Sequence, residues 1–491
     1  MRPVPSRSRA RRLGPVAAAV AALVIASTAF AATTGTISAD LYLNTTSQHA
    51  TQVEPDSFAF GSTIVAAVQT GRFTNGGSSN VCWATSTNAG GTWANGCLPG
   101  TTTYASPAGL WARVTDPSVA YDAQDNVWLI STLALDASVN GAAVLTSRST
   151  DGGLTWGNPV TTAAVGLGQD FDKNWIACDN TATSPFYGNC YTEWDDYGAG
   201  DRILMSTSTD GGLNWGPQRA TANTATGLGG QPLVQPNGTV IVPAASANEG
   251  AIIAFQSTNG GASWSATTTV ATTRFHNAAG GLRSGPLPSA EIDGAGKVYV
   301  AWQDCRFRQG CKSNDIVMST STNGTTWSAV TRVPIDNVTS KVDHFIPGLA
   351  VDPATSGGAA HLALAYYFYP NAKCSVATCQ LKVGFVSSHD GGTNWSAPQT
   401  LAGPMSLSWI ASTTQGPMVG DYISTSFTTD GLAHPLFVTA AAKSGTTFAE
   451  ALATVAGGVS VAVANAAVSG LDQAVVSAGD HPASVSAVRR E

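Results

Sequence analysis

The sequence contains few charged residues and no excess of basic ones. Charged side chains make up 11% of the 491 residues, and 31 acidic residues outnumber 24 basic ones, which gives a net charge of −7. This balance excludes the basic surface with which proteins bind nucleic acid. Together with 52 glycines, the low charge favours a large, turn-rich all-β domain over a helical one.

The sequence also lacks the apolar segments of an integral membrane protein, apart from its N-terminus. Residues 1–31 combine several arginines with an apolar run and end in Ala-Phe-Ala, which is typical of an export signal. Residues 457–491 form an Ala/Val/Gly/Ser-rich tail without the bulky side chains of a membrane span, and we expect it to be loosely ordered. The mature chain is therefore predicted to be secreted, extracellular and monomeric, with no membrane span.

The eight cysteines contain no Cys-x-x-Cys motif and no nearby histidine ligands, so a zinc site is not indicated. They fall instead into four pairs that are close in sequence. In an exported protein, such spacing predicts local disulfides across hairpins and loops. The predicted pairs are Cys82 with Cys97, Cys178 with Cys190, Cys305 with Cys311, and Cys374 with Cys379.

One short stretch recurs along the chain. Residues 149–156 read Ser-Thr-Asp-Gly-Gly-Leu-Thr-Trp, and near copies occupy residues 86–93, 208–215, 257–264 and 388–395, with a shortened copy at residues 321–327. The Ser and Asp or Asn side chains can accept backbone N–H bonds, Gly supplies a positive φ, and Trp packs back onto a sheet. The stretch therefore predicts a tight turn between two strands, with a structural role rather than a catalytic one.

These six turns resemble the Asp-box, S-x-D-x-G-x-T-W, of secreted bacterial β-propellers in the sialidase (neuraminidase) superfamily, also called BNR-repeat proteins. The resemblance implies four-stranded antiparallel blades with the box between strands three and four. It further implies a retaining glycosidase that uses three arginines, a Tyr nucleophile with a Glu partner, and an Asp acid/base. The Phe/Tyr-Arg-Ile-Pro motif that carries the first arginine of this family is absent from the chain.

A second repeat marks the start of each blade. Pro117, Asn174, Pro232, Pro288 and Pro347 lie 57, 58, 56 and 59 residues apart, and apolar segments follow them. Further copies near residues 54–60 and 420–423 raise the number of first strands to seven, one more than the boxes. We therefore expect a single propeller over residues 36–456, with seven blades rather than the alternative of six. Residues 36–43 would supply the last strand of the blade that has no box.

Meander geometry predicts which end of the blades carries function. The boxes mark one face, so the starts of first strands and the ends of second strands converge on the other, at the axial mouth. For a sparsely charged chain, this mouth collects many polar residues. The candidate catalytic residues are Asp116, Asp172, Tyr422 and Asp421, and the resemblance implies that Tyr422 is the nucleophile and Asp116 or Asp172 the acid/base. The candidate substrate-binding residues are Arg283, Arg306, Arg308, Glu54, Gln231, His344 and Glu193.

Three function classes remain open. Paired carboxylates can act as acid and base or nucleophile in glycoside hydrolysis, so the first is a secreted sialidase-like glycosidase acting on an extracellular glycan or glycoprotein. The second is a non-catalytic propeller that binds carbohydrate or protein, and the third is a polysaccharide lyase. No cofactor is indicated, although the same carboxylates could bind a structural Ca²⁺. Alternatively, each Asp only caps the start of its strand.

Overall fold

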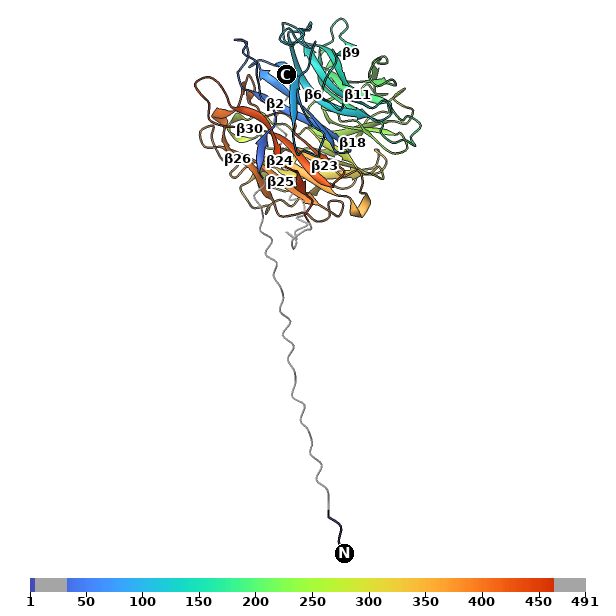
Figure 1. Cartoon of the computed structure of the whole chain (residues 1–491), viewed down its shortest axis with the longest axis vertical. Helices are drawn as coiled ribbons and strands as arrows, with labels where there is room; N and C mark the ends of the chain where they lie inside the picture. The colour runs from blue at the N-terminus through green and yellow to red at the C-terminus, as the bar shows by residue number, and fades with distance from the viewer. Residues whose placement is uncertain (5–32, 463–491) are drawn as a thin grey trace. The chain divides into compact units, whose positions relative to one another are not determined.

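The computed structural model describes residues 1–4 and 33–462 of the chain (Figure 1). The chain divides into two compact units, residues 1–32 and residues 33–491, and every described strand belongs to the second. Nearly all of the expected export signal and most of the expected tail lie outside the described residues. Among the described residues, no helix has the length and hydropathy needed to cross a bilayer.

Antiparallel strands in sets of four build the second unit, and most strands pair with their neighbours in the chain. This all-β arrangement is consistent with a propeller-like fold. Chain order gives the first strands as β2 (Gln52–Phe60), β6 (Arg113–Asp122), β10 (Phe171–Cys178), β14 (Gly227–Leu228) with β15 (Leu233–Val234), β19 (Ser289–Ile292), β23 (Asp343–Val351) and β29 (Ser424–Phe427). The second strands are β3 (Thr63–Arg72), β7 (Val127–Leu135), β11 (Cys190–Asp196), β16 (Val240–Ser246), β20 (Val298–Asp304), β24 (Leu362–Tyr369) and β30 (Leu432–Ala440).

The outer half of each set consists of a third and a fourth strand. The third strands are β4 (Ser78–Ser86), β8 (Gly141–Ser149), β12 (Arg202–Ser208), β17 (Ala251–Ser257), β21 (Asp315–Ser321), β25 (Gln380–Ser388) and β31 (Glu450–Val455). The fourth strands are β5 (Ala94–Cys97), β9 (Val160–Ala164), β13 (Arg219–Ala220), β18 (Thr268–Thr272), β22 (Thr331–Arg332), β26 (Gln399–Ser406) and β1 (Thr34–Thr36). A single pairing of Ser78 with Val114 joins the first two sets into one sheet.

The remaining elements are short. A small hairpin of β27 (Ser412–Thr413) and β28 (Gly416–Pro417) precedes β29, and β32 (Val459–Ser460) pairs with β30. Ordered structure therefore continues past the expected start of the tail at residue 457. The 3-10 helices are η1 (Tyr197–Ala199), η2 (Ala279–Gly281), η3 (Gln309–Cys311), η4 (Gly357–Ala359) and η5 (Leu407–Trp409).

The six repeated turns each lie between a third and a fourth strand. In residues 149–156, the Ser149 hydroxyl donates to Asp151 at 2.8 Å, and the same carboxylate accepts the backbone N–H groups of Leu154 and Thr155. Gly153 has a φ of 80° and donates its N–H to the Ser149 hydroxyl. The side chains thus satisfy several backbone donors of the turn, and Thr85 of the neighbouring set donates to the Gly153 carbonyl at 2.7 Å. The same Ser-to-Asx bond begins at Ser86, Ser208, Ser257, Ser321 and Ser388.

First strands contact one another in chain order. β2 contacts β6, β6 contacts β10, and the series continues through β15, β19, β23 and β29, which contacts β2 again. β2 and β6 lie side by side in Figure 1. Residues 36–43 were expected to pair with the last set, but the pairing strand is β1, which ends at Thr36 and joins β31. Beyond it, only the Ile37 N–H extends the ladder, donating to the Leu452 carbonyl at 3.0 Å.

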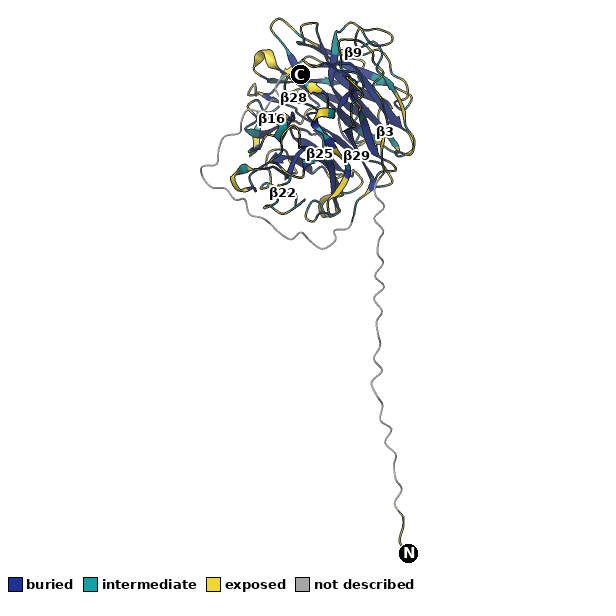
Figure 2. Ribbon diagram, turned by 90° about the vertical axis from the view of Figure 1, so that its left-hand side faces the viewer, coloured by how far each residue is buried: buried dark blue, intermediate teal, exposed yellow. Residues whose placement is uncertain are grey.

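The hydrophobic core lies between neighbouring sets, where buried strand faces meet (Figure 2). One cluster joins Tyr299 and Ile316 of the fifth set to Leu349 and Leu364 of the sixth. A four-stranded sheet has two apolar faces, so each set buries its surface only against its neighbours. All four predicted disulfides are confirmed, namely Cys82–Cys97, Cys178–Cys190, Cys305–Cys311 and Cys374–Cys379.

Candidate functional site

Four first strands are interrupted at the same point by a β-bulge. In β2, β6, β10 and β23 the pairing register shifts, and one non-glycine residue in each bulge has a positive φ. These residues are Glu54 (55°), Asp116 (46°), Lys173 (51°) and Ile346 (50°). A non-glycine residue in this region costs about 1–3 kcal/mol, and bulges of this kind turn a side chain away from its normal face. Three of these four residues, Glu54, Asp116 and Lys173, carry a charged side chain.

These three charged side chains and Asp421 form one buried cluster. The Lys173 Nζ lies 2.6 Å from Asp421 Oδ2, 3.4 Å from Asp116 Oδ1 and 3.8 Å from Glu54 Oε1. Asp421 precedes β29, so the four residues come from segments that are far apart in the sequence. Each is at most 3% exposed. Buried charges are stable only when they are paired, and here Lys173 is the shared cation. We call these four residues with Arg283 the Lys173 cluster.

Arg283 is the second cation of the Lys173 cluster. Its guanidinium makes two bonds to the Asp421 carboxylate, with a distance of 2.8 Å from Nε to Oδ1. Burial raises the pKa of Asp421, but Arg283 and Lys173 outweigh this effect and hold it well below its usual range. The Asp421 backbone N–H donates to Glu54 Oε1 at 3.2 Å, and Gln69 donates to the other Glu54 oxygen. Asp421 is therefore a permanently ionised carboxylate in a fixed position.

Two cavities border the Lys173 cluster. The larger has a volume of about 420 Å³, and its walls include Arg72, Arg283, Asn75, Thr413 and Gln415. This volume is within the range of about 300–1,000 Å³ that is typical of small-molecule sites. The smaller, of about 10 Å³, has room for about one water and is lined by Asp116, Lys173, Trp175, Gln231 and Tyr422, among others. Two buried arginines thus face the larger cavity, and carboxylate, amine and aromatic groups face the smaller one.

The carboxylates of the cluster are close enough to act on one bond. Lys173 Nζ is 2.6 Å from Asp421 and 3.4 Å from Asp116, so these two carboxylate oxygens are at most about 6 Å apart. A retaining glycosidase needs two carboxyl groups about 5–5.5 Å apart, and an inverting one about 6.5–9.5 Å. The upper limit allows the retaining geometry for this pair.

Tyr422 lies beside the cluster and is nearly fully buried. Its hydroxyl donates a hydrogen bond to the Pro117 carbonyl at 3.1 Å, and its ring packs edge-on against Trp175 with a centroid distance of 4.9 Å. Gln231 lines the same small cavity, and its side-chain oxygen accepts the Ala290 N–H at 2.8 Å. Of the residues predicted from the sequence, the structure thus brings together Asp116, Asp421, Tyr422, Glu54, Arg283 and Gln231.

Asp172 and Glu193 belong to a separate group of acids on β10 and β11. Asp172 pairs in register with Asp195, while Glu193 accepts the Gly230 N–H at 3.1 Å. Burial raises the pKa of Glu193 well above its usual range, and burial together with Asp172 raises that of Asp195. Asp172 lines a third cavity, next to the Lys173 cluster rather than within it.

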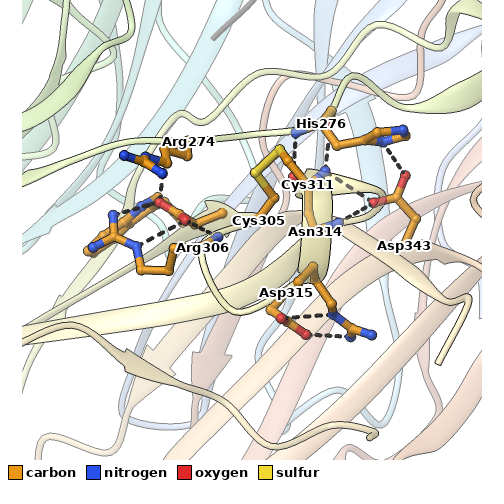
Figure 3. Close-up of a disulfide and its surroundings, with 11 residues drawn as sticks. Arg274, His276, Cys305, Arg306, Cys311, Asn314, Asp315 and Asp343 are labelled. Atoms are coloured by element: carbon orange, nitrogen blue, oxygen red, sulfur yellow. Dashed lines mark hydrogen bonds and ion pairs between the residues drawn. A yellow bond between two sulfur atoms is a disulfide. The ribbon is translucent and has the colours of Figure 1, made fainter. Parts of the chain in front are cut away.

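Arg306, Arg308 and His344 lie in a different region. Figure 3 shows Arg306 and Asp315 beside the Cys305–Cys311 disulfide of this region. Arg306 pairs with Asp304 through two bonds, of 3.0 and 2.7 Å. Arg308 pairs with Asp315 at 2.9 Å and with Asp336 at 2.6 Å. None of these arginines shares a partner with the Lys173 cluster among the described contacts, so the three-arginine clamp implied by the resemblance is not assembled from Arg283, Arg306 and Arg308.

His344 is buried beside this second group of charges. Its Nε2 lies 3.9 Å from Asp336, and its ring packs edge-on against Tyr366. Burial lowers the pKa of His344, which favours the neutral imidazole. His344, Asp315 and Asp336 have the ligand spacing of a metal site. However, the guanidinium groups of Arg308 and Arg332 already occupy both carboxylates, so this group does not fit a cation such as Ca²⁺.

Comparison with known protein families finds one similarity, which covers part of the chain. Residues 63–292 match the family model described as BNR repeat-like domain. The match spans the second strand of the first set through the first strand of the fifth, and so includes Asp116, Lys173 and Arg283. No curated protein sequence matches the chain.

Solved structures similar to this chain share little sequence with it. A Hadza microbial sialidase, Hz136, is 13% identical over 83% of this chain, which spans 66% of that protein, with a TM-score of 0.44. A Dyadobacter fermentans protein of unknown function is 14% identical over 72% of this chain and 99% of its own, with a TM-score of 0.46. The α-L-arabinofuranosidase Arb93a from Fusarium graminearum is 13% identical over 73% of this chain and 98% of its own, with a TM-score of 0.43.

Arg72 and Lys173 were not among the catalytic and substrate-binding residues predicted for a glycosidase, although Lys173, beside Asp172, was expected at the mouth. Arg72 ends β3, a second strand, and the rule that second strands end at the mouth would have selected it had the first set been included. Lys173 follows Asp172 in the sequence, and only the bulge in β10 turns it into the cluster. Strand alternation alone assigns neighbouring residues to opposite faces and gives no sign of a bulge.

Proposed function

We propose that the protein is a secreted, sialidase-like glycoside hydrolase that acts on an extracellular glycan. The observation that carries this proposal is the Lys173 cluster, in which three carboxylates surround one amine beside a cavity lined by Arg72 and Arg283. A buried carboxylate acid/base close to a tyrosine, beside a cavity, supports glycoside hydrolysis with a Tyr nucleophile. The four disulfides support an extracellular location.

The proposed architecture is a seven-bladed propeller, in which the six repeated turns are Asp-boxes. Seven first strands that contact one another in a closed series support this count, as does the use of β1 as the outer strand of the last set. In such a ring, the bulged first strands face the axis, which explains why Glu54, Asp116 and Lys173 meet although about 60 residues separate each from the next.

The proposed roles follow from charge. Asp421 stays ionised because of Arg283, and it stabilises the positive charge that develops on the sugar ring in the transition state. Asp116 is the acid/base, and Tyr422 is the nucleophile that the resemblance implies. Attack by Tyr422 requires its hydroxyl to leave the Pro117 carbonyl. Arg72 and Arg283 face the same cavity and hold the carboxylate of an acidic sugar.

The experiment is a screen of the secreted protein against aryl sialosides, aryl arabinofuranosides and a glycan panel. Asp116→Asn, Asp172→Asn and Tyr422→Phe are assayed in parallel on any substrate that is cleaved. We expect turnover of an acidic glycoside and a loss of about 10²–10⁴-fold in Asp116→Asn. Asp172→Asn keeps more activity, because Asp172 lines a neighbouring cavity. Turnover that is unchanged in all three variants rejects the site.

A second candidate is a binding protein without catalysis. The observation that favours it is the saturation of the cluster, because Lys173 and Arg283 both pair with Asp421 and the Tyr422 hydroxyl is bonded to the Pro117 carbonyl. Such a site would still bind an acidic sugar through Arg72 and Arg283. Binding by titration calorimetry, together with no cleavage of the bound glycan after long incubation, would support this candidate over the hydrolase.

A further inference from the structure

Two buried acids lie where the third set meets the fourth, and they have no role in the function proposed above. Glu193 and Asp195 are both on β11, and Asp172 of β10 pairs in register with Asp195. Residues two apart on a strand point to the same face, so Glu193 and Asp195 lie side by side. Glu193 is 0% exposed and Asp195 is 1% exposed. The strand therefore places two carboxyl groups in the interior of the molecule.

Glu193 holds a segment of the fourth set. The Gly230 N–H, between β14 and β15, donates to Glu193 Oε2 at 3.1 Å. A Cβ atom on Gly230 would lie 2.7 Å from Glu193 Cδ, so the missing side chain allows this close approach. Gly229 and Gln231, on either side of Gly230, line the small cavity of the Lys173 cluster. Glu193 therefore fixes part of the wall of that cavity.

One oxygen of each acid has no hydrogen-bond partner among residues 33–462. These oxygens are Glu193 Oε1 and Asp195 Oδ1, and both are inaccessible to solvent. A buried carboxylate that is ionised needs a cation or several hydrogen-bond donors, and a protonated one does not. The hydrogen bonding of the two acids therefore favours their neutral forms.

The charges near Asp195 act in the same direction. Burial together with Asp172, Glu193 and Asp201 raises the pKa of Asp195 well above its usual range. Lys173 opposes these acids, but it pairs with the carboxylates of its own cluster. Burial likewise raises the pKa of Glu193, although the Gly230 N–H lowers it.

The other elements that pack against the two acids bring no compensating charge. On β12, the residues that pair with them are Ile203 and Met205. In the fourth set, residues 227–231 read Gly-Leu-Gly-Gly-Gln, and β16 contributes Val242 and Ala244 to the same apolar cluster as Ile203. Ionisation of either acid therefore has to be compensated by water, which has no access while the two sets are closed.

We propose that Glu193 and Asp195 form a pH-sensitive joint between the third and fourth sets, which holds residues 229–231 while both carboxyl groups are protonated and releases them when the groups ionise. The ionised carboxylates repel each other and Asp172, and they draw in water. Because Glu193 meets the fourth set at Gly230, the wall of the small cavity loosens as pH rises. The joint acts on the backbone whether or not a glycan is cleaved, so it is independent of the proposed reaction.

The sign of the pH effect follows from the direction of the two pKa shifts. Unfolded Asp and Glu titrate near pH 4, and the folded state keeps these protons to a higher pH. The stability that the protonated groups contribute is complete below about pH 4 and is lost as pH rises through their folded-state pKa. Glu193→Gln should make the loss smaller, because its amide oxygen can accept the Gly230 N–H and cannot ionise.

The test is amide hydrogen exchange in residues 227–234 from about pH 5 to about pH 9, corrected for the exchange rates of an unfolded peptide. We expect the corrected exchange of the wild type to increase about tenfold over this range, and that of Glu193→Gln to increase less than about twofold. Asp195→Asn is a second variant, with an increase between these values. Glu450→Gln is the matched control, because Glu450 is also buried, has a raised pKa and accepts a backbone N–H, from Ala411.

An increase that Glu193→Gln abolishes and Glu450→Gln keeps supports the joint. Constant exchange in the wild type overturns it, and so does an equal increase in the wild type and Glu193→Gln. Suppression of the wild-type increase by about 1 mM Ca²⁺ would show that the ionised carboxylates bind a cation, which also overturns release as their response. Thermal unfolding at about pH 5 shows that each variant is folded before exchange is compared.

Discussion

Two networks of buried arginines and aspartates occur in this molecule, and they differ in what surrounds them. In the Lys173 cluster, Arg283 and Lys173 share Asp421, the cations and carboxylates border two cavities, and three of the residues sit in strained bulges. In the second network, Arg308 and Arg332 both bind Asp315 and Asp336. Arg308 also donates to the carbonyls of Asn337 and Val338, which anchors the loop before β23.

The comparison shows that a buried ion pair does not by itself mark a functional site. Both networks are well paired, and by sequence Arg306 and Arg308 looked as suitable for a clamp as Arg283. Two features distinguish the Lys173 cluster from the second network, namely the strained backbone at three of its residues and the cavities that border it. A bulge with a positive φ in β2, β6 and β10 costs free energy and brings in charges that a regular strand would not. In the second network, the charged side chains hold a loop in place. In the Lys173 cluster, they line cavities.

The largest expected effect comes from removing the central cation of each network. Lys173→Met leaves three buried carboxylates with Arg283 as the cation that remains in the cluster, and we expect it to lower the free energy of unfolding by about 3–5 kcal/mol. Arg308→Met should cost less, about 1–3 kcal/mol, because Arg332 still pairs with both Asp315 and Asp336. Urea unfolding of both variants measures the difference. An equal loss in both would contradict the idea that Lys173 alone centres its cluster.

A smaller effect is the pH dependence of stability. Buried carboxylates with and without a neighbouring cation contribute to it with opposite sign. Burial raises the pKa of Asp56 to about 7, whereas Asp421 is held low by Arg283. An unfolded Asp titrates near 3.9, so the unfolded state loses its Asp56 proton first as pH rises. The wild type should therefore lose stability between about pH 4 and pH 7, and Asp56→Asn should reduce this slope. The Asp421 contribution has the opposite sign, since it is present above about pH 4 and is lost as pH falls further.

Unfolding free energies at several pH values, measured for the wild type and Asp56→Asn, give the result. The asparagine oxygen can still accept the Val119 N–H, so the backbone contact is kept. Identical slopes for the two proteins would show that Asp56 is ionised in the folded state.

The smallest expected effect is in the repeated turns. Asp151→Ala removes bonds to Ser149, Leu154 and Thr155, but the turn is exposed at this position. We expect a loss of about 1 kcal/mol in stability and no change in ligand binding. Chemical denaturation and a binding assay check both parts. A change in binding without a change in stability would show that the turn face also carries function.

Local chemistry made much of this structure predictable from the sequence. The turn at Ser149 and Asp151 satisfies its own backbone, so the motif predicts the reversal wherever it occurs. The disulfides are similar, because Cys178 and Cys190 lie at the facing ends of neighbouring strands. The mouth residues Glu54, Asp116 and Asp421 were predicted because strand starts of successive sets converge. That Arg283 joins Asp421 was not predictable, since its segment lies in a long loop without regular strands.

Two arginines predicted for the site lie outside it, because each pairs with an aspartate that is close in the sequence. Arg306 binds Asp304, two residues away, and Arg308 binds Asp315, seven residues away. Because these carboxylates pair with the arginines, the two guanidinium groups do not join the Lys173 cluster. Lys173 is the reverse case, because its partners lie on other sets and only the bulge in β10 directs it to them.

The central claim is that the Lys173 cluster, and not the second network, carries the activity. The most direct test is the kcat for a cleaved acidic glycoside in Asp116→Asn and Asp315→Asn, measured side by side on folded protein. Both changes neutralise a buried aspartate that is paired with a cation. We predict a loss of about 10²–10⁴-fold in Asp116→Asn and less than about threefold in Asp315→Asn. Equal activity of the two variants would contradict the assignment of the site.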